Sequence, residues 1–152
     1  MITNLDSLLY QAEAEYLEHQ DLANFKSEVF ALEKRLEVYE ILSSQETNIF
    51  QYVANNLSND FPDESEAKIK LALKHWLMVT RYCGMSMLFD NPMYLKHRIL
   101  DWLPEQIAAH QMKQIERSLF LLLEKRLKKT LGSQQYSFLQ PYLKQAKETL
   151  LE

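Results

Sequence analysis

The sequence predicts an all-α, globin-like fold, and three observations support that prediction. Only two glycines and four prolines occur in 152 residues, too few for strands joined by tight turns. Several long segments repeat apolar residues at the three- and four-residue spacing of one helix face. The corners between them are short and the segments show no equal-length repeat, which fits a globin-like stack better than an up-down bundle. We therefore expect a single domain over residues 1–152.

A helical hairpin is expected at the N-terminus, within residues 1–42. Its first arm carries an apolar stripe made of Leu5, Leu8, Leu9, Ala12 and Tyr16. Asp21 is suited to cap the second arm. Ser43 and Glu46 have the spacing of a capping box, which predicts that a third helix starts there and ends at NDFP (59–62).

The helix expected over residues 67–91 is the element against which the others pack. Its inward face carries apolar or small side chains at helical spacing, namely Ile69, Leu73, Trp76, Thr80, Cys83 and Met87. The opposite face is also apolar in its second half, because Arg81 is the only charge in residues 77–89. A helix that is apolar on most sides is buried. Asp63 or Ser65 is expected to cap its start.

Three further helices are expected after the central one. Pro92 begins a short apolar helix over residues 92–102, because proline at the first helical position sacrifices no hydrogen bond. A long helix over residues 105–131 ends in lysines and arginines, which suit the negative end of a helix dipole. Gly132 is a natural cap for it, and Pro141 either kinks the last helix or sets a late start.

The charge and the apolar runs exclude several classes of protein. A net charge of −4 gives no electrostatic basis for binding nucleic acid, so a protein or a small molecule is the expected partner. The longest uncharged run near the middle, residues 82–89, is far too short for a transmembrane segment, and we expect a cytoplasmic protein. Cys83 is the only cysteine and is expected to be a buried, inert thiol.

Neither catalysis nor a metal site is expected. The four histidines lack metal-ligand spacing, and the sequence has no Ser-His-Asp order, nucleophile elbow or phosphate-binding loop. In a globin-like fold a single histidine can ligate haem iron, and His97 and His110 lie in the region where such a ligand would sit. A surface or hydrogen-bonded histidine is the simpler interpretation of both.

Five segments are similar, in the same order, to the landmarks of a known family. They are EYLEHQDL (15–22), the segment 43–62 that ends in SNDFP, WLMVTRY (76–82), DNPMYL (90–95) and SFLQPYL (137–143). The chain thereby resembles the phycobiliproteins, meaning the α and β subunits of phycocyanin and allophycocyanin, over nearly its whole length. The resemblance implies a globin-like fold with an N-terminal helical hairpin.

The resemblance also implies where a pigment would be held, and there the sequence departs from the family. Members bind an open-chain tetrapyrrole, a bilin, through a cysteine near the start of the central helix, and an Arg-Asp pair follows it. Aligning Tyr82 with the family tyrosine places Ile69 at the cysteine and Leu71 and Ala72 at the pair. We therefore expect no covalent bilin, whereas a noncovalent bilin or another tetrapyrrole stays open.

A noncovalent tetrapyrrole is expected between the first half of the central helix and the helix over residues 92–102. Basic side chains there could receive propionates, and an aromatic ring could stack on the pigment. The candidate residues are Lys70, Lys74, His75, Trp76, Tyr94 and His97. Solvated lysines and a packed core tryptophan are the alternative interpretation.

Assembly is the other property that the resemblance implies. In the family the hairpin of one subunit lies on the body of another, and an acidic residue of its first helix pairs with an arginine of the central helix. Glu13 or Glu15 supplies the acid here, Met78 occupies the arginine position, and Arg81 lies about one turn further along. We expect a dimer, with a second copy or a related phycobiliprotein-like subunit, through Leu5, Leu8, Leu9, Glu13, Tyr16 and Arg81.

Two functional hypotheses follow. The first is a cyanobacterial-type phycobilisome protein, non-pigmented or with a noncovalent pigment, that acts in phycobilisome assembly or regulation or in bilin handling. This hypothesis allows attachment to thylakoids through the phycobilisome. The second is a sensory or carrier globin that binds haem or another tetrapyrrole. An enzyme of tetrapyrrole handling has the least support.

Overall fold

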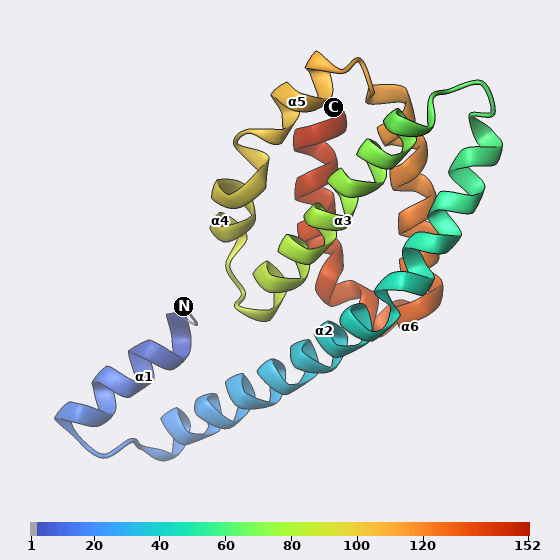
Figure 1. Cartoon of the computed structure of the whole chain (residues 1–152). Helices are drawn as coiled ribbons and strands as arrows, with labels where there is room; N and C mark the ends of the chain where they lie inside the picture. The colour runs from blue at the N-terminus through green and yellow to red at the C-terminus, as the bar shows by residue number, and fades with distance from the viewer. Residues whose placement is uncertain (1–2) are drawn as a thin grey trace.

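Helices make up the architecture of residues 3–152, the range that the computed structural model describes. The elements are α1 (Thr3–Ala14), α2 (His19–Asp60), α3 (Glu66–Leu88), α4 (Pro92–Leu95), the π-helix η1 (Lys96–Leu100), α5 (Leu103–Ala109) and α6 (Lys113–Leu151). α3 contacts both α2 and α6, and α4, η1 and α5 cover one side of this core (Figure 1). The expected all-α class is confirmed. No helix of the described range is long and apolar enough to cross a membrane.

α2 is one continuous helix of 42 residues, so the helix start predicted at Ser43 is wrong. A serine caps a helix only where the preceding chain leaves helical geometry, and residues 19–60 hold no glycine or proline to cause this. Ser43 is therefore exposed on the helix surface, while Ile49 is buried on its inner side. The predicted end is confirmed, because α2 stops at Asp60 and Phe61 caps it.

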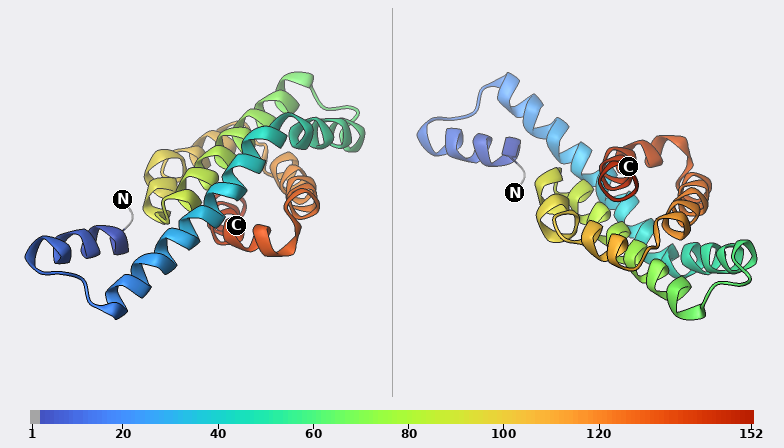
Figure 2. Two further views of the ribbon diagram at one scale, coloured as in Figure 1. Left: turned by 90° about the horizontal axis from the view of Figure 1, so that it is seen from below. Right: turned by 90° about the horizontal axis from the view of Figure 1, so that it is seen from above.

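α1 and the first part of α2 form a hairpin that projects from the body of the molecule (Figures 1 and 2). At its corner, the Gln11 amide donates to the Asp21 carboxylate at 2.9 Å, and the backbone N–H of Glu18 donates to the same carboxylate at 3.2 Å. Asp21 thus acts from inside the first turn of α2, which begins at His19, and not as its cap. The expected hairpin is present with a slightly earlier second arm.

α3 is the buried centre of the fold, as the sequence predicts. Ser65 caps it by accepting a hydrogen bond from the backbone N–H of Lys68 at 3.3 Å. On its inward face Leu73 is half-buried, and the other five residues are buried, namely Ile69, Trp76, Thr80, Cys83 and Met87. Burial raises the pKa of the free Cys83 thiol, which keeps it in its unreactive form.

The helix predicted over residues 105–131 is interrupted near its start. α5 ends at Ala109, and Gln111 has a φ of 54°, so the chain turns before α6 begins. Met112, which follows the turn, is completely buried. Burial of this large apolar side chain outweighs the helical preference of a segment that contains no glycine or proline between residues 105 and 131.

α6 bends at Gly132, whose φ of 74° and ψ of 168° favour glycine over any residue with a Cβ. The bend turns the second segment of α6 back along the body, where it packs beside α3 (Figure 1). Pro141 lies inside this second segment and so does not set a late start. Gly132 therefore separates the helix predicted over residues 105–131 from the last predicted helix, as expected.

We expect Gly132→Ala to lower the free energy of unfolding by about 1–3 kcal/mol, because an L-residue is strained at that backbone geometry although its Cβ would meet no atom within 4 Å. Gly84→Ala is the matched control, since its added Cβ would make ordinary contacts at 3.5 Å with Leu42 and Tyr39 inside a helix. It should be neutral or stabilising by up to about 1 kcal/mol. Urea unfolding monitored by circular dichroism measures both, and an unchanged Gly132→Ala variant would contradict the strained geometry.

Candidate functional site

Four of the predicted tetrapyrrole residues lie in the first half of α3 but on different sides of that helix. Lys70 and Lys74 are exposed, and Lys70 pairs with Glu66 at 2.7 Å within the helix. His75 and Trp76 are buried. Trp76 is completely inaccessible, and its ring packs on that of Phe120 with centroids 5.2 Å apart. The alternative interpretation, a packed core tryptophan, matches this placement.

His75 forms a buried pair with Glu116 that joins α3 to α6. Its Nδ1 lies 2.7 Å from Oε1 of Glu116, and the two side chains are 6% and 0% exposed. Burial raises the pKa of Glu116, and its hydrogen bond to His75 opposes that shift. The sequence carried no signal for this pair, because the two residues are 41 positions apart and come from different helices.

The other two predicted residues lie outside α3. Tyr94 of α4 packs on Tyr82 with ring centroids 5.9 Å apart, and the Arg98 guanidinium lies 5.4 Å from its centroid. His97 of η1 is exposed and hydrogen-bonded to Asp101 at 3.1 Å. Tetrapyrrole binding by the six candidates stays a prediction. Among residues 3–152, no group of three or more His, Cys, Asp or Glu side chains is placed to hold a metal ion.

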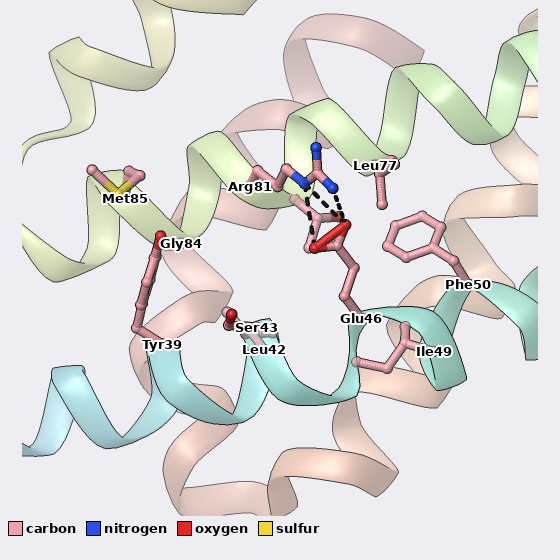
Figure 3. Close-up of a pocket in the computed structure, with 11 residues that line it drawn as sticks. Tyr39, Leu42, Ser43, Glu46, Ile49, Phe50, Leu77, Arg81, Gly84 and Met85 are labelled. Atoms are coloured by element: carbon pink, nitrogen blue, oxygen red, sulfur yellow. Dashed lines mark hydrogen bonds and ion pairs between the residues drawn. The ribbon is translucent and has the colours of Figure 1, made fainter.

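A groove of about 230 Å³ lies between α2 and α3 (Figure 3). Phe50 and Leu77 form one apolar end, Tyr39 and Met85 form the other, and a charged pair lies between the ends. The lining residues are Tyr39, Leu42, Ser43, Glu46, Ile49, Phe50, Leu77, Thr80, Arg81, Gly84 and Met85.

 

The lining is mostly apolar, and Glu46 and Arg81 are its two charged side chains. Its shape is set by the crossing of α2 and α3, and the Tyr39 ring of α2 lies beside Gly84 of α3.

The charged pair in the groove is formed by Arg81 of α3 and Glu46 of α2. Nε of Arg81 lies 2.9 Å from Oε1 and 3.3 Å from Oε2 of Glu46, and Nη2 also donates to Oε1. These hydrogen bonds raise the pKa of Arg81 above its ordinary value. Glu46, expected from the sequence to be part of a capping box, is instead the partner of the arginine that was expected to pair with another subunit.

The predicted interface residues of the hairpin divide into an inner and an outer set. Leu8 is buried and Leu5 half-buried, and α2 is the helix on which α1 packs. Leu9 is 61% exposed, Tyr16 is 99% exposed, and Glu13 is exposed as well. The first part of α2 adds further exposed apolar side chains, namely Leu22, Phe25, Val29 and Leu36. The exposed side chains of Leu9, Glu13 and Tyr16 are accessible to another molecule, and their use as an interface stays a prediction.

We expect His75→Ala to lower the free energy of unfolding by roughly 3–5 kcal/mol, because it leaves the Glu116 carboxyl buried without its partner. Glu116→Gln keeps a polar side chain beside His75 and removes the buried charge, so it should cost less. Because the pKa of Glu116 is raised by folding, the folded state holds this proton more tightly than the unfolded state. The stabilisation that this proton provides is complete at a pH below the ordinary pKa of a glutamate side chain. It is lost as the pH rises through the raised pKa of Glu116.

The unmodified chain should therefore lose stability relative to the Glu116→Gln variant as the pH rises from about 4 to 7. Urea unfolding at a series of pH values measures it. A difference that does not vary with pH would show that Glu116 does not titrate in this range.

Comparison with known proteins identifies the family. A family model described as phycobilisome protein matches residues 8–150, which is nearly the whole chain. Among curated proteins, no significant match was found. The matched range includes the hairpin from Leu8 onward, all of α3 and almost all of α6. The chain therefore belongs to the phycobilisome protein family.

Proposed function

We propose that this chain is a phycobilisome protein without a covalent bilin, which acts in phycobilisome assembly or regulation by binding a second copy of itself or a related subunit. The observation that carries the proposal is the match between the exposed face of the hairpin and the groove between α2 and α3. Family membership supplies the phycobilisome context.

The residues at the family's pigment position do not fit a covalently held bilin. Ile69, at the position of the family cysteine, has no thiol and its side chain is buried. Ala72 is completely buried in the core, and neither it nor Leu71 can bind a propionate or a pyrrole nitrogen as the family Arg-Asp pair does. The one thiol of the chain, Cys83, is buried in the second half of α3.

The hairpin and the groove each carry a charged side chain between apolar side chains. On the hairpin, Glu13 lies between two exposed apolar side chains, Leu9 of α1 and Tyr16 of the corner that follows Ala14. On α3, Arg81 lies between the apolar ends of the groove, to which this helix contributes Leu77 and Met85. A docked hairpin would therefore place its acid opposite the arginine and its apolar side chains at the two ends.

Apolar burial supplies most of the association energy in this arrangement. An exposed ion pair contributes only about 0–1 kcal/mol, whereas apolar surface contributes about 25 cal/mol for each Å² removed from water. One chain carries both the hairpin and the groove, so two copies related by a two-fold axis form two equal contacts. This two-fold dimer would also cover the exposed apolar residues in the first part of α2.

We expect the full chain to dimerise and the double variant Leu9→Asp with Tyr16→Asp to be monomeric, because both charges would enter apolar ends of the groove. Both side chains are exposed, so their replacement should leave the fold intact. Leu121→Asp is the matched control, since Leu121 is 63% exposed on α6 and does not line this groove. Sedimentation velocity distinguishes the states. A monomeric full chain, or a double variant that still dimerises, would rule out the hairpin as the interface.

Supplying bilin and bilin lyases together with this chain should yield no covalent adduct, because the position of the family cysteine is Ile69. Zinc-enhanced fluorescence of the denatured band on a gel is the measurement, with a phycocyanin subunit expressed in the same way as the positive control. A fluorescent band from this chain would contradict the proposal. Titration of the folded protein with free bilin and with haem, followed by absorption spectra, tests the noncovalent tetrapyrrole separately.

A further inference from the structure

Arg81 is already bound to a carboxylate of its own chain. Two of the three guanidinium nitrogens of Arg81, Nε and Nη2, donate hydrogen bonds to Glu46. Figure 3 shows the remaining nitrogen directed away from Glu46. The Glu46 side chain is 25% exposed and that of Arg81 is 63% exposed, so the carboxylate is seated against the groove while the guanidinium stays open to an incoming molecule.

A second carboxylate that reaches Arg81 would meet Glu46 at close range. Two carboxylates on one guanidinium share its donors and repel each other, so the second one gains less than it would from an unpaired arginine. The apolar ends of the groove are unaffected by this competition, because Leu77 and Phe50 lie to one side of the pair and Met85 lies to the other.

We propose that Glu46 is an intramolecular competitor of the partner's acidic residue at Arg81, and that it keeps hairpin docking weak and reversible. The inference rests on the proposed docking of a second copy's hairpin and names the residue that regulates its strength. Glu46 moderates the contact without blocking it, because Leu9 and Tyr16 still find the apolar ends of the groove.

Partner choice follows from the same competition. With Glu46 present, Arg81 is neutralised before docking, and a hairpin with a neutral residue at the position of Glu13 binds almost as well as one with an acid. Without Glu46, the unpaired guanidinium would favour the acidic hairpin. Glu46 thus makes the groove tolerant of hairpins that differ in charge, which suits association with related subunits as well as with a second copy.

The test is Glu46→Gln in the full chain, with the dimer dissociation constant measured by sedimentation equilibrium at several salt concentrations. We expect association to tighten about two- to fivefold at low salt, and to depend more steeply on salt than in the unmodified chain. Glu40→Gln is the matched control, because Glu40 is an exposed glutamate of α2 that does not line the groove and its replacement changes the net charge equally.

A double-mutant cycle with Glu13→Gln identifies the competing group. If Glu46 acts against Glu13 at Arg81, the gain from Glu46→Gln should disappear when Glu13 is already neutral. A gain that persists in the Glu13→Gln chain would overturn the inference. So would an unchanged or weakened dimer in Glu46→Gln, provided that Leu9→Asp with Tyr16→Asp still separates the subunits. If that double variant stays dimeric, the docking proposal fails together with this one.

Discussion

Burial of α3 between α2 and α6 is the constraint on which the rest of the structure depends. Because α3 is enclosed by these two helices, an imidazole or a guanidinium on it needs a partner inside the protein or a route to the outside along its exposed side. His75 meets the first condition through Glu116, while Arg81 meets the second at the groove. The crossing of α2 over α3 also creates the groove beside Gly84.

The length of α2 explains why so much apolar surface lies outside the core. From Val38 onward its inner side is buried against the body, whereas its first part extends past the body and has only α1 to pack on. α1 is one short helix and covers one side of α2, so Phe25 and Val29 stay about two-fifths exposed. An exposed apolar face on an amphipathic helix is typical of a contact between subunits.

The first half of α3 and its outer side differ in the chemistry that they offer. At the first half of α3, where the family holds its bilin, Ile69 and Ala72 contribute only apolar packing, and Trp76 is sealed against Phe120. The outer side of α3 carries the guanidinium that groups on other helices, or on another molecule, can reach. The proposed role in assembly therefore uses the phycobilisome fold as a scaffold for contacts between subunits.

The sequence by itself determined the helical class, the buried face of α3 from Ile69 to Met87, the break at Pro92 and the bend at Gly132. These features depend on spacing, proline and glycine, which act over one or two helical turns. Only the tertiary structure decided that α2 continues through Ser43, that the chain turns inward at Met112, and that Glu46 and Glu116 face Arg81 and His75. Those outcomes depend on where helices cross, and partners 35 and 41 residues apart leave no local pattern in the sequence.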